Sequence, residues 1–295
     1  MSRLALEVAA TVLLMGAVPV IIRHVTADVV TIGILRLVVA SACMGAWLAA
    51  RRTPLALPNR DWRALAVMGT VFAFHWLLYF LGIKMSSASV AAIGASTFGI
   101  HLIVLGWIVG HHRVRGLDVA AFALAVGGTL LVVPEWRADG RATQGLLLAV
   151  VSAFLYAILP ILHQRHAHMP SRVRAFGQFV FALPLFLILS PWSSWELPAA
   201  DWIWLAVLTV GSTFVAHTLW THLSTVLPTM TTSVVFYLYV PVSLALGAAA
   251  LGERITRPML AGAALIIGGN LLALAALPPR ASGALHLKPE SSRDD

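Results

Sequence analysis

Apolar runs of the length that a membrane-spanning helix needs recur along the whole chain. A helix rises 1.5 Å per residue, so about 20 apolar residues cross the hydrocarbon core of a bilayer. We expect ten such spans, near residues 4–23, 29–49, 62–83, 88–109, 117–134, 144–163, 173–190, 202–221, 231–251 and 258–278. Only 11% of the 295 residues are charged, against about 25% in soluble domains. The sequence therefore predicts an all-α integral membrane protein.

The net charge of +8 reflects basic residues in the short segments between the apolar runs. If the N-terminus is cytoplasmic, thirteen Lys and Arg residues face the cytoplasm and six face the outside. Membrane proteins keep their basic residues on the cytoplasmic side. We therefore expect a multi-pass protein with both termini in the cytoplasm, and no interaction with nucleic acid.

The chain matches itself at a shift of 140 or 141 residues. The aligned segments are Ala17–Pro19 with Ile158–Pro160, Trp62–Val67 with Trp202–Val207, and Ala125–Gly128 with Ile266–Gly269. Each repeat holds five spans, an odd number, so the second repeat crosses the membrane in the opposite sense. Inverted repeats around a site near the midplane are a recurring transporter design. We expect a first repeat at 1–140, a second at 141–280 and a polar cytoplasmic tail at 281–295, which we expect to be disordered.

One motif near the end of the chain resembles a known family. Leu251-Gly252-Glu253-Arg254, followed by Gly262, Leu265-Ile266 and Gly268-Gly269, is similar to the closing motif of EamA-type proteins of the drug/metabolite transporter superfamily. The resemblance covers nearly the whole chain, although the first repeat has His112 where the second has Glu253. It implies two five-helix repeats in a bacterial inner membrane. Among these proteins the chain looks most like the YddG-type amino-acid exporters.

Polar and aromatic side chains inside the spans are candidates for the substrate site, because such groups are costly in lipid and usually face a bundle interior or a wet cavity. Several fall at helical spacing, on the third span and again on the eighth. The predicted substrate-binding residues are His75, Trp76, Tyr79, Ser96, Phe98, Tyr156, His217, Trp220, Tyr237 and Tyr239. The alternative is that these rings pack against neighbouring helices or lipid.

The inverted topology predicts two separate groups within this set. His75 and Tyr79 should lie toward the outside, with Ser96 and Phe98, whereas His217 and Trp220 should lie toward the cytoplasm, with Tyr237 and Tyr239. We expect the two groups to form the outer and inner constrictions of one central cavity. An amphipathic amino acid suits such a lining, because rings pack on apolar groups and attract an ammonium group.

Four further residues stand out inside the spans. Pro19, Pro160 and Pro241 each remove a backbone hydrogen bond, and they are either hinges for alternating access or static kinks. Arg36 is a permanent charge about eight residues into the second span. We favour a structural role for Arg36, with pairing to a substrate carboxylate as the alternative.

These features favour a secondary transporter that exports amino acids, aromatic ones included, and related small metabolites by alternating access. Export of drugs or other amphipathic metabolites is the closest alternative. An intramembrane enzyme is less favoured, because the chain has no His-Glu-x-x-His helix and no Gly-x-Ser-x-Gly elbow. A non-transporting scaffold would have no cavity. We expect no cofactor, no metal and no enzymatic activity, with the bilayer and a small molecule as partners and a monomer or weak homodimer as the assembly.

Overall fold

The computed structural model describes residues 3–108, 115–133, 136–227 and 235–275, and all regular structure within them is helical. Seven stretches are long and apolar enough to cross a membrane. They are α1 (Arg3–His24), α2 (Val29–Ala50), α3 (Asn59–Met85), α4 with α5 (Ala88–Ala95, Phe98–Ile108), α7 (Arg141–Arg165), α8 with η1 (Ser171–Leu189, Ser190–Trp192), and α9, η2 and α10 together (Ala199–Ala206, Val207–Val215, Ala216–Val226).

Three shorter apolar helices complete the predicted ten. They are α6 (Gly116–Val132), the stretch Val235–Leu251 that contains α12 (Tyr239–Leu251), and α13 (Arg257–Ala275). The predicted ten-helix membrane fold is therefore confirmed. The expected polar tail, residues 281–295, and His112 lie outside the described residues.

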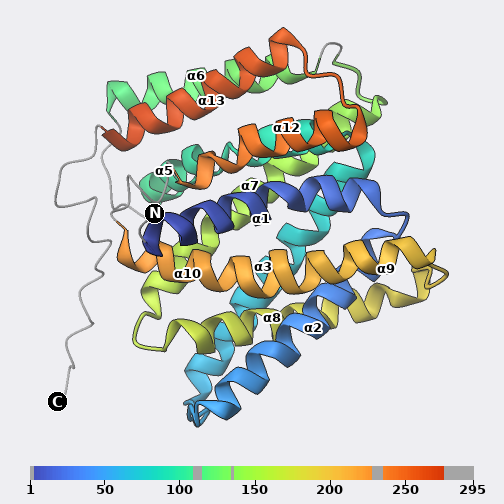
Figure 1. Cartoon of the computed structure of the whole chain (residues 1–295). Helices are drawn as coiled ribbons and strands as arrows, with labels where there is room; N and C mark the ends of the chain where they lie inside the picture. Colours follow the sequence, from blue (N-terminus) through green and yellow to red (C-terminus); the bar gives the residue numbers. More distant parts are fainter. Residues whose placement is uncertain (1–2, 109–114, 134–135, 228–234, 276–295) are drawn as a thin grey trace.

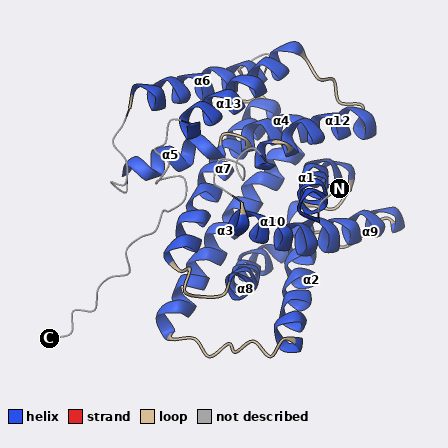
Figure 2. Ribbon diagram, turned by 60° about the vertical axis from the view of Figure 1, so that its left-hand side comes forward, coloured by secondary structure: helices blue, strands red, loops and turns tan. Residues whose placement is uncertain are grey.

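The helices form one bundle in which α6 and α13 lie side by side at one edge, and α2 and α8 lie side by side at the other (Figure 1). Figure 2 shows the same arrangement from a second direction. Between these edges, α3 packs on α7 and α8, and α1 packs on α12 and α10. The large buried side chains Phe72, Phe80, Phe179 and Phe186 belong to one continuous core.

Glycine allows α6 and α13 to pack with their backbones in contact. A side-chain carbon on Gly128 would lie 2.6 Å from the Gly262 carbonyl oxygen, and one on Gly269 would lie 2.8 Å from the Ala121 carbonyl oxygen. Gly127, by contrast, has open space beside it. Small residues are the usual means by which membrane helices approach closely.

Two spans that the sequence predicts as continuous helices are irregular. The span Ala88–Ile108 breaks at Ser96 and Thr97, where the Asn270 side-chain amide of α13 donates to the Ser96 carbonyl oxygen at 2.8 Å. The other irregular span contains the π-helical segment η2. Both departures depend on partners in neighbouring helices, which a local apolar pattern does not reveal. π-Helical segments often occur at functional sites.

The three predicted hinge prolines occupy different settings. Pro19 and Pro160 lie inside the unbroken helices α1 and α7. Pro241 lies in the first turn of α12, three residues after Leu238, where the helical stretch is interrupted. Proline is tolerated there because first-turn N–H groups lack an intrahelical partner. A hinge role for the three residues stays a prediction.

Glu253 gives the closing sequence motif a physical role. Gly252 ends α12 in the left-handed conformation with φ of 64°, and the Glu253 N–H donates to the Gly247 carbonyl oxygen. This turn directs the Glu253 carboxylate to the N-terminus of α4, where it accepts from the backbone N–H groups of Ala88 and Ser89 at 2.8 and 2.9 Å. A carboxylate at a helix N-terminus satisfies unpaired donors and interacts favourably with the helix dipole.

Loop contacts at the end of the bundle opposite the N-terminus also join the two halves of the chain. The carboxylate of Asp201 accepts from the backbone N–H and the hydroxyl of Thr26, both at 2.7 Å. Asp28 caps α2 and accepts from the Ser194 N–H at 2.8 Å. Burial alone would raise the pKa of Asp28, but its hydrogen bonds outweigh burial and hold the pKa below the ordinary value of 3.8.

A mirrored contact occurs at the end of the bundle that holds the N-terminus. Asp61, which aligns with Asp201 at a shift of 140, lies 3.0 Å from His168 Nε2 in the segment between α7 and α8. Thr26 lies in the corresponding segment between α1 and α2. Equivalent contacts at opposite ends of the bundle are what two inverted repeats predict.

Candidate functional site

A cavity of about 70 Å³ lies in the interior of the bundle and is lined by both halves of the chain. Six predicted substrate-binding residues line it: His75, Trp76, Tyr79, Tyr156, His217 and Tyr239. The other lining residues are Met15, Val18, Arg36, Phe80, Ala95, Ala153, Ser212 and Phe236. Their elements are α1, α2, α3, α4, α7, η2, α10 and the Val235–Leu251 stretch.

One face of α3 supplies the largest share of this lining. His75, Trp76, Tyr79 and Phe80 recur at the spacing that places side chains on one side of a helix. The His75 ring stacks on the Tyr156 ring of α7, with 4.6 Å between centroids, and on the Tyr79 ring at 6.1 Å. The stripe predicted from the sequence therefore faces the cavity as a continuous aromatic wall.

Ser152 of α7 fixes the orientation of the His75 ring. The Nδ1 atom lies 3.0 Å from the Ser152 carbonyl oxygen, and the Ser152 hydroxyl donates to the His75 carbonyl oxygen at 2.9 Å. The Ser152 hydroxyl oxygen also lies 2.7 Å from Nδ1, so this ring nitrogen contacts both polar groups of Ser152.

The structure does not separate the cavity residues into outer and inner groups. Phe72 packs against both His75 and His217, with ring centroids 6.0 and 5.8 Å apart, and His217 also lies 6.0 Å from Trp76. The expected separation rested on the depth of each residue along oppositely directed spans. The π-helical segment η2 ends at Val215, two residues before His217, and both histidines line the cavity, as predicted.

Four predicted residues lie outside the cavity lining in this conformation. The Ser96 hydroxyl donates to the Ile93 carbonyl oxygen at the end of α4. Phe98 and Trp220 pack on Phe236, at 4.9 and 5.5 Å between centroids, and so form a second layer behind it. The Tyr237 hydroxyl occupies the space that a side chain at position 99 would need. Helical spacing could not show that these side chains are directed to neighbouring helices.

Arg36 is the main cavity residue to which the sequence prediction gave a different role. Arg36 is 1% exposed and therefore lies inside the bundle. Its Nε donates to the Thr213 hydroxyl oxygen at 2.8 Å. Its guanidinium carbon lies 4.0 Å from the centroid of the Trp76 ring. The sequence shows Arg36 as a permanent charge within an apolar run, but it does not show toward which neighbours the side chain is directed.

The lining has a distinctive charge. Arg36 is the one Arg or Lys among the described residues that line the cavity, and no Asp or Glu is among them. No group of three His, Cys, Asp or Glu within the described residues is arranged to hold a metal ion. The Tyr239 hydroxyl donates to the Ala92 carbonyl oxygen at 2.9 Å. The chemistry available is therefore ring stacking, neutral hydrogen bonding and one fixed positive charge.

The cavity is small in this conformation. Its volume of about 70 Å³ corresponds to about two water molecules in the liquid, whereas sites for small organic ligands have volumes of about 300–1,000 Å³. Admitting a metabolite therefore requires the surrounding helices to move apart.

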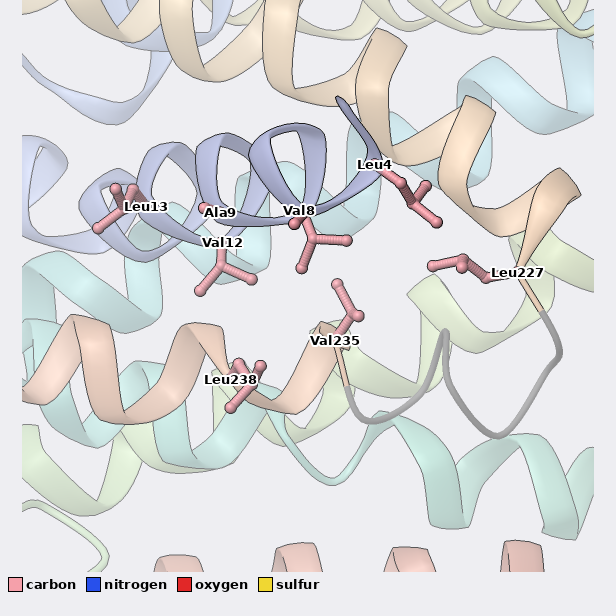
Figure 3. Close-up of a pocket in the computed structure, with 9 residues that line it drawn as sticks. Leu4, Val8, Ala9, Val12, Leu13, Leu227, Val235 and Leu238 are labelled. Atoms are coloured by element: carbon pink, nitrogen blue, oxygen red, sulfur yellow. The ribbon is translucent and has the colours of Figure 1, made fainter. Parts of the chain in front are cut away.

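A larger groove of about 660 Å³ lies on the surface, between α1 and the start of the Val235–Leu251 stretch (Figure 3). Nine apolar residues line it: Leu4, Ala5, Val8, Ala9, Val12, Leu13, Leu227, Val235 and Leu238. None of the polar cavity residues reaches it. A wholly apolar groove on a membrane-spanning surface fits contact with lipid.

Comparison with known proteins agrees with this architecture. The sequence matches the EamA-like transporter family twice, over residues 4–133 and 143–275. It is 24% identical over 270 residues to an uncharacterized transporter of Archaeoglobus fulgidus, covering 88% of this chain and 92% of that protein. A solved crystal structure has the same fold, with a TM-score of 0.66 and 19% identity over 92% of this chain and 98% of the other. The chain is therefore a multi-pass membrane transporter that belongs to the EamA-like transporter family.

Proposed function

We propose that the protein is a secondary transporter that exports amino acids, aromatic ones included, across the inner membrane. The observation that carries the proposal is the aromatic cavity, to which both halves of the chain contribute His and Tyr side chains. Rings of this kind pack on the apolar part of an amino acid while their hydroxyl and imidazole groups bond its polar part.

Transport would proceed by alternating access, with the repeats 1–140 and 141–280 moving against each other around the cavity. Two sets of contacts, one at each end of the bundle, would break and form in turn during this movement. Asp201 with Thr26 and Glu253 with α4 hold one end of the bundle, and Asp61 with His168 holds the other. Breaking one set while the other stays formed would open the cavity to one side of the membrane.

Both termini would lie in the cytoplasm, as the distribution of basic residues indicates. The contacts of Glu253 and Asp201 would then close the outer side of the cavity, and the contact of Asp61 would close the cytoplasmic side. The direction of net export would follow from the substrate gradient or from coupling to an ion.

Flux into liposomes tests this proposal. Radiolabelled phenylalanine, threonine and lysine would be followed into liposomes that hold the purified protein, with protein-free liposomes as the reference. We expect saturable flux of phenylalanine above background. The same flux for folded protein and empty liposomes would refute amino-acid transport, and dyes or other amphipathic compounds would then be tested as substrates.

The cavity histidines provide a matched comparison. His75→Leu and His217→Leu should lower phenylalanine flux, because each removes a polar group from the cavity lining. His101→Leu is the control, because His101 is another histidine within a span, half-buried, but packs on Phe154 outside the cavity. If all three variants transport as well as the unchanged protein, the assignment of the cavity histidines is wrong.

A further inference from the structure

We infer that Arg36 binds the carboxylate of the transported molecule, so that the cavity selects organic monocarboxylates and zwitterions over amines. This inference rests on the proposed transport function. It reverses the structural role that the sequence favoured for Arg36, and it adds a specific recognition group to a cavity that is otherwise lined by neutral side chains.

The first observation is a buried charge for which the described residues supply no counter-ion. Arg36 is 1% exposed, and no described Asp or Glu forms an ion pair with it. Its Nη1 atom is buried and has no hydrogen-bond partner within the described part of the chain. A charge in this setting is costly unless something pairs with it, and ionisable groups kept within a membrane usually serve function. A ligand in the cavity can supply the missing partner.

The second observation is that the rest of the guanidinium is held in place. The Thr213 hydroxyl donates to the Leu208 carbonyl oxygen at 2.9 Å, within the π-helical segment, so its oxygen is oriented to accept from Arg36 Nε at 2.8 Å. The guanidinium also lies over the Trp76 ring at 4.0 Å and near the Phe80 ring at 5.1 Å. Its position is therefore fixed before any ligand binds, and Nη1 is left for that ligand.

The charge balance identifies the class of ligand. One guanidinium balances one negative charge, which suits a carboxylate better than a phosphate dianion, and charge-assisted hydrogen bonds of this kind are strong away from water. No Asp or Glu among the described residues lines the cavity to receive an amine without a carboxylate, and Arg36 would repel such an amine. The His75, Tyr156 and Tyr239 rings of the lining would contact the remainder of the molecule.

Four related probes test the inference. They are phenylalanine, 3-phenylpropionate, phenylalaninamide and phenethylamine, of which the first two carry a carboxylate and the last two do not. In the purified protein, the carboxylates should raise the melting temperature and compete for phenylalanine flux. The amide and the amine should be weaker competitors by about tenfold or more, the effect of losing one charge-assisted hydrogen bond.

Variants of Arg36 and its neighbour assign this preference to the guanidinium. Arg36→Gln should abolish the difference between the acids and the amide. Arg36→Lys and Thr213→Val should reduce it, because the first loses the planar fork and the second loses the acceptor for Nε. Arg174→Gln is the control, because Arg174 is another buried arginine, with an unbonded Nε, that does not line the cavity. If Arg36→Gln fails to fold, the other two variants carry the test.

The two readouts separate this inference from the proposed function. A carboxylate preference in melting temperature that Arg36→Gln loses, without any flux, would support the site and refute amino-acid transport. Flux without a carboxylate preference, or a preference that folded Arg36 and Thr213 variants retain, would overturn the role of Arg36 and leave the proposed function standing. The absence of both flux and a melting-temperature response would overturn both.

Discussion

Replacement of Glu253 should destabilise the end of the bundle opposite the N-terminus, because its carboxylate caps α4. It accepts from the N–H groups of Ala88 and Ser89, and from the Ser89 hydroxyl at 2.5 Å. Ala88 and Ser89 are fully buried. Glu253→Ala would leave two backbone donors without their partner, each at a cost of about 1–3 kcal/mol. Glu253 is itself half-buried, so entering water would offset part of this cost.

We therefore expect the free energy of unfolding to fall by about 2 kcal/mol for Glu253→Ala, and by about 1 kcal/mol for Glu253→Gln, which keeps one acceptor oxygen. On the scale of large single domains, 2 kcal/mol corresponds to about 4–8 °C in melting temperature. Thermal unfolding in detergent gives the magnitude, and amide hydrogen exchange should show faster exchange at Ala88 and Ser89.

Glu196→Gln is the matched control, because it removes an exposed carboxylate from the loop of Ser194, which contacts Asp28 at the same end of the bundle. It should leave both the melting temperature and the exchange of α4 unchanged. Equal effects of Glu253→Gln and Glu196→Gln would refute the capping role and leave the closing motif of the sequence without this explanation.

Three other substitutions test the packing and the loop contacts. Gly128→Ala should destabilise the protein by about 1–3 kcal/mol, because its new carbon would meet the Gly262 carbonyl oxygen. Gly127→Ala is the control and should not destabilise it, because open space lies beside Gly127. Equal melting temperatures of the two variants would contradict the close contact between α6 and α13. Asn270→Ala should cost about 1–3 kcal/mol by leaving a buried carbonyl oxygen unpaired at the break after α4, and an unchanged melting temperature would count against it. Because the folded state lowers the pKa of Asp28 below 3.8, its stabilising effect is present above pH 3.8 and lost as the pH falls through the folded value. The melting-temperature difference between the unchanged protein and Asp28→Asn should therefore shrink from pH 7 to pH 3, and a difference that stays constant would argue against this effect.

The sequence predicts the helices well because each carries its own apolar signal, and the same local logic explains why the aromatic residues of α3 lie together. His75, Trp76 and Tyr79 share one face of a regular helix, so their spacing alone places them together. Gly128 and Gly269 face the neighbouring helix whereas Gly127 and Gly268 do not, and the local pattern does not show which of two adjacent glycines has the contact.

The parts of the site that sequence reasoning missed depend on contacts between distant segments. Arg36 turns inward because Thr213, 177 residues away, accepts from its Nε, and Thr213 is presented by a π-helical segment that no apolar pattern indicates. Ser96 is removed from the cavity by a helix break that Asn270 of α13 stabilises. Each of these outcomes is set by how the helices are rotated relative to one another.

The most direct test of the central claim, that substrate passes through the interior cavity, is to fill that cavity and measure phenylalanine flux in liposomes. Ala153→Phe places a large ring in the lining, and Val151→Phe places the same ring on the exposed face of the same helix. With both variants folded, the cavity account predicts saturable flux for Val151→Phe and flux at background for Ala153→Phe. Flux through Ala153→Phe equal to that of the unchanged protein would contradict it.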